Sequence, residues 1–238
     1  MGDGATQGAG VARARHLAVL DPGLRVAELD CFNRLARHAP LPCTYHLPAL
    51  FGLDSLARAS DGLAGVVVLG SGASVNDALP WQDALIDWLR PRLADGLPYL
   101  GLCYGHQLLA HVYGARVAVV FPGDQKARGW RQIALDANPL WGAACRGDVL
   151  VSHREAVVDA PPPLRVVGRS DAVAIEALAV EGRPQWGLQA HPEATAAFAA
   201  NNHLGVAPEP AALAFGHGIV DRFAAWVAAG GQSTGSRS

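Results

Sequence analysis

Apolar residues are arranged along the chain in two alternating patterns. Short continuous apolar runs have the length and composition of strands that are buried on both faces. Longer stretches carry apolar residues at every third or fourth position, which predicts amphipathic helices. The predicted strands cover 16–20, 65–69, 98–102 and 185–189. The predicted helices cover 25–38, 80–94, 104–113 and about 208–229.

The order of these segments predicts the fold class. Strands that alternate with helices pair in parallel through right-handed crossovers. We therefore expect an α/β fold with an open, mostly parallel but mixed sheet and helices on both faces. Between about 116 and 183 strands come without clear helices, so we expect antiparallel additions or hairpins there. Ligands of open sheets bind beyond the carboxyl ends of the strands, so we expect the functional residues at that edge of the sheet.

Length and composition predict one domain. The chain has 238 residues, and 50% of them are hydrophobic, which is enough for one large core. Residues 1–15 are small and polar without a period and predict a disordered leader. Residues 230–238 predict a flexible tail. No repeat or long linker lies between them, so we expect a single domain over 16–229.

Charge and cysteine spacing exclude several classes of protein. A formal net charge of −2 argues against a strongly basic nucleic-acid-binding protein. No apolar run reaches the length of a transmembrane helix, and the N-terminus has no continuous apolar signal region, so we expect a cytoplasmic protein with no membrane partner. Without a C-x-x-C pair, an H-E-x-x-H motif or a P-loop, no disulfide framework, metal site or cofactor is expected. The four cysteines are Cys31, Cys43, Cys103 and Cys145.

One predicted strand leads directly into a cysteine that begins a predicted helix. Residues 101–105 read Gly-Leu-Cys-Tyr-Gly, a thiol version of the nucleophile elbow, which is a sharp turn between a strand and a helix. The helix dipole and the free N–H groups at a helix N-terminus favour a thiolate. Cys103 is therefore a candidate nucleophile, and the N–H of Tyr104 is placed to donate to an oxyanion. Taken alone, the pattern also fits a buried structural cysteine.

A second strand end carries a candidate base and a group to orient it. The apolar run 185–189 is followed by His191, Pro192 and Glu193. A nucleophilic cysteine needs a base, and the base needs an orienting group. Residues two positions apart at a strand end can point to the same side, so Glu193 can hold the His191 imidazole in one tautomer.

The predicted strand 65–69 ends in a glycine-containing turn. Gly70, Ser71 and Gly72 follow it, and the two glycines allow their N–H groups to approach a ligand closely. Gly70 is therefore a candidate substrate contact. Taken alone, the turn also fits an ordinary glycine loop.

Two segments resemble the class I glutamine amidotransferase family. They read GLCYGHQLLA at 101–110 and GLQAHPEAT at 187–195, and their order and separation also fit. The resemblance covers nearly all of 16–195 and is closest to the GMP synthase-type amidotransferase domain and its free-standing single-domain relatives. It implies a flavodoxin-like fold in which Cys103 is the nucleophile, His191 the base and acid, and Glu193 the third triad member.

The resemblance also implies residues that hold the oxyanion and the substrate. It makes the N–H of Ser71 the second oxyanion donor, with the N–H of Gly72 as the alternative. Gln107 matches the family's G-H-Q segment, whose glutamine helps to bind substrate. The chain also departs from related sequences at Lys126 and Ala127, which stand where those sequences often carry an acidic residue.

A further segment resembles the family's S-H-x-D-x-V loop, which borders the glutamine pocket. Residues 151–157 read VSHREAV, so the resemblance makes Ser152 and His153 substrate contacts. Glu155 replaces the aspartate, and Arg154 stands where several synthases have glycine. These two departures bear on the outer part of the substrate.

The resemblance implies hydrolysis of the glutamine side-chain amide through a Cys103 thioester, giving glutamate and ammonia. In the first interpretation the ammonia goes to a separate synthase partner. In the second, the chain is a free-standing γ-glutamyl hydrolase that acts on a γ-glutamyl amide or peptide with the same triad. In the third, it is a non-catalytic relative that binds a ligand or partner, which the presence of all three triad residue types argues against. An open outer pocket favours the second interpretation over the first.

Overall fold

Five neighbouring strands run parallel on one side of the central sheet. In the computed structural model, which describes residues 14–231, they lie in the order β2, β1, β3, β4 and β11. All adjoining pairs among them are parallel, so their carboxyl ends meet at one edge. Their bounds are Cys43–His46, His16–Leu20, Leu63–Val68, Tyr99–Leu102 and Gln185–Leu188.

The other side of the sheet is antiparallel. Four strands continue it beyond β11 in the order β10, β9, β6 and β7, each antiparallel to its neighbour. This confirms the expectation of antiparallel additions between 116 and 183, and it makes the sheet mixed. Their bounds are Ala177–Val180, Leu164–Arg169, Ala127–Leu135 and Cys145–His153. A separate small sheet pairs β5 (Val117–Val119) with β8 (Glu155–Val157).

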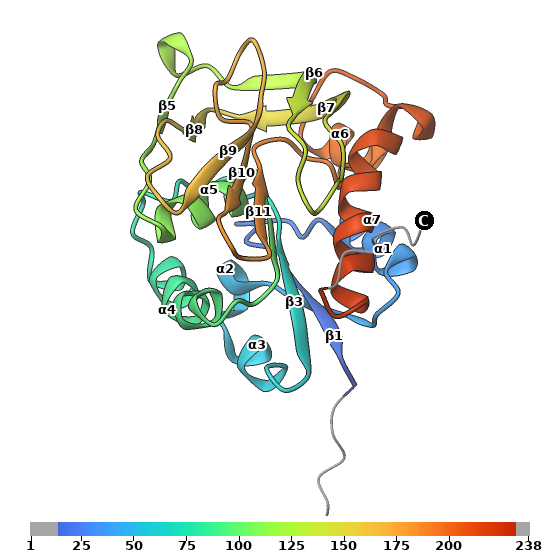
Figure 1. The fold of residues 1–238 in the computed structure, drawn as a ribbon. Coiled ribbons are helices and arrows are strands. Elements are labelled where there is room, and N and C mark those ends of the chain that lie inside the picture. The colour runs from blue at the N-terminus through green and yellow to red at the C-terminus, as the bar shows by residue number, and fades with distance from the viewer. Residues whose placement is uncertain (1–13, 232–238) are drawn as a thin grey trace, which may run out of the picture.

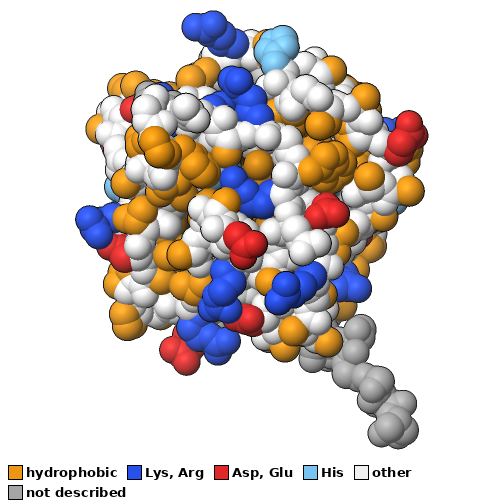
Figure 2. Space-filling view, turned by 90° about the horizontal axis from the view of Figure 1, so that it is seen from above, with side chains coloured by type: hydrophobic (Ala, Val, Ile, Leu, Met, Phe, Trp, Pro, Cys, Tyr) orange, Lys and Arg blue, Asp and Glu red, His pale blue; other side chains and the backbone are white. Residues whose placement is uncertain are grey.

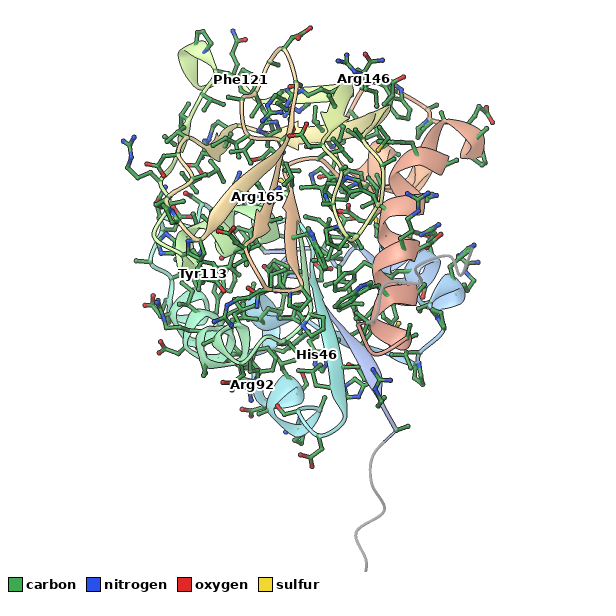
Figure 3. All side chains as sticks on the ribbon, in the orientation of Figure 1. His46, Arg92, Tyr113, Phe121, Arg146 and Arg165 are labelled. Carbon is green, nitrogen blue, oxygen red and sulfur yellow. The ribbon has the colours of Figure 1, made fainter. Side chains whose placement is uncertain are left out.

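Helices cover both faces of the parallel strands (Figure 1). Alternate residues of a strand point to opposite faces, so Val19 packs in one cluster with Phe223, while Leu20 packs in another with Leu85. Side chains fill the space on both sides of the sheet (Figure 3), which explains the continuous apolar runs. One face carries α1 (Leu29–His38) and α7 (Ala214–Ala228), and the other carries α3 (Asp54–Arg58), α4 (Pro80–Ala94) and α5 (Tyr104–Val112).

The predicted helices differ from the observed ones mainly at their first turns. Helix α4 occupies 80–94 as predicted, but α1 begins at Leu29. The carboxylate of Asp21 accepts hydrogen bonds from the N–H groups of Gly23 and Glu28, which holds the intervening residues as a loop. Shorter elements, too brief to show a period, were not predicted. They include β2, α2 (Pro48–Phe51), α6 (Ala196–Asn201) and two 3₁₀ turns, Pro122–Asp124 and Pro210–Leu213.

The predicted leader and tail fall largely outside the residues that the structure describes, because 1–13 and 232–238 are not among them. Between residues 14 and 231, no helix combines the length and the apolar character that crossing a bilayer requires.

Helix α5 carries a fully buried histidine that links stability to pH. His106 packs against β11, where a Cβ at Gly187 would lie 2.7 Å from its Nδ1. Burial lowers the pKa of His106 to about 3. Between that value and the ordinary value of about 6.5, the unfolded chain binds a proton here and the folded chain does not. The contribution of His106 to the free energy of unfolding is therefore fully present above the pKa that the residue has in the unfolded chain. It is lost as the pH falls toward the pKa that the residue has in the folded chain.

We expect the free energy of unfolding to decrease between pH 6.5 and 4, with a contribution from His106 of up to about 1.4 kcal/mol per pH unit. Replacing His106 with glutamine removes this contribution and flattens the decrease. Urea unfolding at a series of pH values measures the slope, with His111→Gln on the same helix as the control. An unchanged slope in the His106 variant would argue against the linkage.

Candidate active site

The ends of three adjacent parallel strands bring the predicted site residues together. Cys103 directly follows β4, Gly70 lies two residues beyond β3, and His191 lies three residues beyond β11. Strand β4 pairs with β3 on one side and with β11 on the other. The N–H of Cys103 donates to the carbonyl of Leu188 at 2.9 Å, which ties the turn to the end of β11. The sheet topology thus places all three segments at one edge.

Cys103 stands on a strained turn. Its φ of 50° and ψ of −101° form a left-handed conformation that is rare for a residue with a side chain. A Cβ at Gly101 would lie 2.2 Å from the carbonyl oxygen of Gly105, and one at Gly105 would lie 2.2 Å from that of Val68. Only glycine fits at both positions, so α5 packs directly onto β4 and β3. The G-x-C-x-G pattern is therefore explained by the packing of backbone on backbone.

His191 and Glu193 form a buried pair. The Nδ1 of His191 lies 3.0 Å from Oε1 of Glu193, and the N–H of His191 donates to the carbonyl of Leu150 at 2.8 Å. The ring of Phe198 lies 4.5 Å from the imidazole, measured between centroids. The other ring nitrogen, Nε2, is buried and makes no hydrogen bond to any residue among 14–231. This nitrogen is therefore available to exchange a proton with a ligand.

The residues around His191 favour its protonated form. Burial by itself lowers its pKa, but the interactions with Cys103 and Glu193 outweigh burial and raise the pKa to about 10. A protonated imidazole can give its proton to a leaving group. Gly70 leaves room for this arrangement, because a Cβ there would lie 2.7 Å from Cε1 of His191 and 3.6 Å from Cβ of Cys103.

Several backbone N–H groups around Cys103 have no hydrogen-bond acceptor within the described part of the chain. They belong to Tyr104, Gly70, Ser71 and Gly72. The side chain of Ser71 fixes the turn, because its hydroxyl donates to the carbonyl of Pro22 at 2.7 Å and accepts from the N–H of Ala73 at 3.1 Å. The N–H groups predicted as oxyanion donors are therefore unpaired and held in place.

A cavity of about 240 Å³ adjoins Cys103. Gln107 lines it, and its amide nitrogen donates to the carbonyl of Glu155 at 2.9 Å and to Oε1 of Gln189 at 3.2 Å. The side-chain carbonyl of Gln107 accepts no hydrogen bond from any described residue. Ser152 also lines the cavity, with its carbonyl oxygen 4.0 Å from Sγ of Cys103. The space suits a ligand the size of an amino acid.

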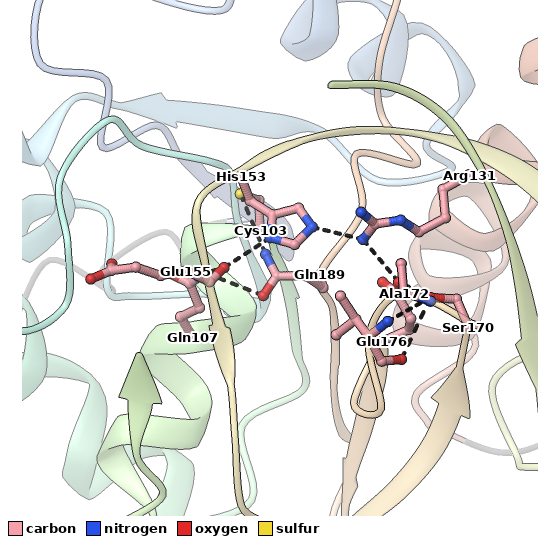
Figure 4. A network of polar contacts seen from close by, with 10 residues as sticks. Cys103, Gln107, Arg131, His153, Glu155, Ser170, Ala172, Glu176 and Gln189 are labelled. Carbon is pink, nitrogen blue, oxygen red and sulfur yellow. Dashed lines mark hydrogen bonds and ion pairs between the residues drawn. The ribbon is translucent and has the colours of Figure 1, made fainter. Parts of the chain in front are cut away.

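A buried ion pair supports one wall of this cavity (Figure 4). Arg131 lies 3.0 Å from Oε1 of Glu176 and 2.8 Å from Nε2 of His153. Arginine can only donate, so Nε2 accepts, and Nδ1–H donates to the carbonyl of Glu155 at 2.9 Å. Burial lowers the pKa of His153 to about 4, which keeps the ring neutral. Because both ring nitrogens bond within the protein, the His153 side chain shapes the wall, and its nitrogens are not free for a ligand.

A second cavity, of about 680 Å³, adjoins the first. His191 and Glu193 line this second cavity, whereas Cys103 and Gln107 line the first. Both cavities therefore meet beside the reactive groups. The residues that line both are Ser71, Gly72, Lys126 and Ser152.

Comparison with known proteins identifies the family. The family model described as glutamine amidotransferase class-I matches residues 53–204, which is more than half of the chain. The chain belongs to the class I glutamine amidotransferase family.

Curated relatives of this amidotransferase domain include two glutamine-hydrolyzing GMP synthases. The enzyme of Anaplasma marginale is 31% identical over 184 residues, which cover 74% of this chain and 34% of that enzyme. The enzyme of Thermomicrobium roseum is 34% identical over 179 residues, which cover 74% of this chain and 31% of that enzyme. The chain thus spans about a third of the length of these curated relatives.

Solved structures share the fold of this amidotransferase domain over nearly their whole length. A glutamine amidotransferase of Methylobacillus flagellatus aligns with a TM-score of 0.67 at 18% identity, over 95% of this chain and 99% of that one. A glutamine amidotransferase of Thermotoga maritima aligns with a TM-score of 0.64 at 17% identity, over 90% of this chain and 97% of that one. The predicted flavodoxin-like α/β fold is confirmed.

The structure gathers the predicted site residues at one edge of the sheet, and it adds others. Gln189 was not predicted, although its amide nitrogen lies 3.8 Å from Sγ of Cys103. Asp21 was also missed, and both residues directly follow a buried strand, which is the signal that could have indicated them. The pairing of Arg131 with Glu176 joins positions 45 residues apart, and no sequence pattern marks it.

Proposed function

We propose that this chain hydrolyses the side-chain amide of glutamine through a thioester on Cys103. The sulfur bonds to the γ-carbonyl carbon, the C–N bond breaks, and His191 gives its proton to the departing ammonia. His191 then activates a water molecule that attacks the thioester carbon, which breaks the C–S bond and releases glutamate. Glu193 holds the imidazole in the orientation that leaves Nε2 for these proton transfers.

In this proposal the oxyanion binds to the unpaired N–H groups of Tyr104 and of the Ser71–Gly72 turn. Each such donor typically lowers the barrier by about 3 kcal/mol. The free side-chain carbonyl of Gln107 accepts a hydrogen bond from the α-ammonium group of the substrate. Ser152 and Gly70 contact the substrate through their backbone.

One observation carries the proposal, namely that the strained Cys103, the buried pair of His191 and Glu193, and the unpaired N–H groups lie at one edge of the sheet. Incubating the purified chain with L-glutamine tests it. We expect glutamate and ammonia to appear in equal amounts. The absence of both products would contradict hydrolysis, and it is the result that a non-catalytic relative would give.

We further propose that a separate synthase consumes the ammonia. The relatives that resemble this chain are glutamine-hydrolyzing GMP synthases, and the chain matches only about a third of their length. In this proposal the synthase supplies the role of the part of those enzymes that the match does not cover. The Cys103 thiol must stay reduced, which fits the cytoplasm.

Replacing Glu193 with glutamine is expected to lower kcat/KM for glutamine by about 10³- to 10⁴-fold, because an orienting carboxylate contributes less than the nucleophile. Since the Glu193 charge helps to raise the pKa of His191, the variant should also lose activity at a lower alkaline pH. A pH profile of kcat/KM measures both effects. An alkaline limb that stays in place would show that Glu193 has only a structural role.

A second candidate function is a free-standing γ-glutamyl hydrolase that uses the same residues. The observation that favours it is the second cavity, which His191 and Glu193 line and which Cys103 and Gln107 do not. A γ-glutamyl peptide assayed beside glutamine distinguishes the two candidates.

A further inference from the structure

The two cavities divide the substrate at the bond that breaks. Cys103 attacks the acyl carbon, and it lines only the smaller cavity. His191 protonates the leaving nitrogen, and it lines only the larger one. The glutamyl part of a substrate therefore belongs in the smaller cavity, and the amine that leaves belongs in the larger.

The larger cavity exceeds what an ammonia molecule needs. Its volume of about 680 Å³ lies within the range of about 300–1,000 Å³ that small-molecule sites occupy. Ammonia contains one heavy atom and makes no use of the walls beyond His191. A larger amine can contact them.

The wall formed by the loop after β1 is held in place by buried polar contacts. The carboxylate of Asp21, which is fully buried, accepts hydrogen bonds from the N–H of Gly23 at 2.9 Å, from the N–H of Glu28 at 2.7 Å and from the hydroxyl of Tyr45. The amide of Asn202 donates to Oε1 of Glu28 at 3.1 Å and joins this wall to the end of α6. The larger cavity is therefore formed before any ligand binds.

Two cations line the larger cavity, and one of them, Lys126, also lines the smaller cavity with Cys103. Arg25 and Lys126 make no salt bridge or hydrogen bond to any residue among 14–231. Of the acidic groups of the cavity, Glu193 pairs with His191, while Glu28 accepts a hydrogen bond from the amide of Asn202, which is neutral and cannot offset a carboxylate charge. Figure 2 shows Lys and Arg side chains across the middle of the face seen from above, with Asp and Glu side chains among them and hydrophobic ones beside them. Arg25 and Lys126 outnumber the one carboxylate of the cavity that no cation pairs with, and this surplus of positive charge favours an anionic ligand.

Apolar side chains also line the larger cavity. Leu24 and Val26 line the cavity and are 42% and 69% exposed, while Phe198 is buried against the imidazole of His191. An amine with a short carbon chain can therefore pack on these side chains and present an anionic group to Arg25 and Lys126.

We infer that the larger cavity is a leaving-group subsite for amines that carry an anionic group, so that the chain also hydrolyses γ-glutamyl amides of such amines and prefers them to amides of neutral amines. This inference rests on the proposed thioester chemistry at Cys103. The C–N bond of the amide breaks as the C–S bond forms, and the proton of His191 passes to the departing amine nitrogen. Water then cleaves the thioester as it does with glutamine.

Three substrates test the subsite by glutamate release. γ-L-Glutamylglycine has an anionic leaving amine, γ-L-glutamylethylamide has a neutral one of similar size, and L-glutamine has none. We expect kcat/KM for γ-glutamylglycine to exceed that for the ethylamide by about tenfold, since each of two exposed ion pairs contributes up to about fivefold. The ratio should fall as salt is raised, because salt screens exposed charges.

Variants test whether the two cations cause the preference for γ-glutamylglycine over the ethylamide. Arg25→Met and Lys126→Met should each lower the ratio between γ-glutamylglycine and the ethylamide about threefold to fivefold. Arg90→Met, which removes an exposed arginine on α4 outside both cavities, should leave the ratio unchanged. A ratio within one protein sample does not depend on the fraction of that sample that is folded.

The outcomes separate this inference from the proposed function. If the chain hydrolyses glutamine but shows no preference for γ-glutamylglycine over the ethylamide, the subsite is wrong and the thioester chemistry stands. If it hydrolyses glutamine and neither amide, the larger cavity serves a partner or the exit of ammonia, and the subsite is again wrong. If it releases glutamate from none of the three, both proposals fail.

Discussion

Replacing Cys103 with alanine should abolish glutamate release from glutamine. Alanine keeps the Cβ on the strained turn and removes only the sulfur that forms the thioester, so the fold is preserved while the reaction loses its nucleophile. In a comparable triad, removal of the nucleophile costs about 10⁶-fold, so we expect a loss of about 10⁵-fold or more. Glutamate formation by the variant and by the unchanged protein, measured under the same conditions, gives the ratio.

A second cysteine provides the matched control for this prediction. Cys43 lies in β2 and lines neither cavity, and burial raises the pKa of its thiol to about 11. Cys43→Ala should therefore retain glutamate release, although it also removes one thiol. Hydrolysis of glutamine by Cys103→Ala at nearly the original rate would show that Cys103 is not the nucleophile.

Replacing Arg131 with methionine should lower the free energy of unfolding by about 3–5 kcal/mol. The side chain of Arg131 is 10% exposed and that of Glu176 is fully buried. Removing the arginine leaves the Glu176 carboxylate buried with only the hydroxyl of Ser170 at 2.7 Å. It also removes the donor that fixes the tautomer of His153. Urea unfolding followed by circular dichroism measures the loss.

A double-mutant cycle separates the ion pair from other effects of the substitution. In the variant that combines Arg131→Met with Glu176→Gln, no charge remains to be buried without a partner. The loss in this double variant should be smaller than the sum of the two single losses by about 1–3 kcal/mol. Strictly additive losses would mean that the two side chains do not stabilise each other.

The parallel side of the sheet could be predicted because its strands are buried on both faces. Such strands appear as uninterrupted apolar runs, and Val66 to Leu69 is an example whose side chains point alternately into two separate core clusters. The first turn of α1 could not be predicted, since Asp21 holds residues that have helical spacing in a loop. A carboxylate that captures distant N–H groups overrides the local pattern.

The predicted site residues depend on short segments, each contained in one strand end. Cys103, His191 and Glu193 could be proposed because the chemistry proposed for each requires a local pattern that the sequence carries directly. The ion pair of Arg131 with Glu176 could not, because it depends on which antiparallel strands lie near each other. The larger cavity is likewise absent from the sequence pattern, since its walls come from the loop after β1, from the turn after β3 and from α6.

The most direct test of the central claim is the mass of the intact protein after acid quenching during turnover of L-glutamine. Acid stops the reaction while the thioester still holds the acyl group. We expect a fraction of the protein to gain the mass of one glutamyl group, with the peptide that contains Cys103 carrying it and the Cys103→Ala variant showing none. Glutamate release without any such adduct, or an adduct that persists in the Cys103→Ala variant, would contradict the assignment of Cys103 as the nucleophile.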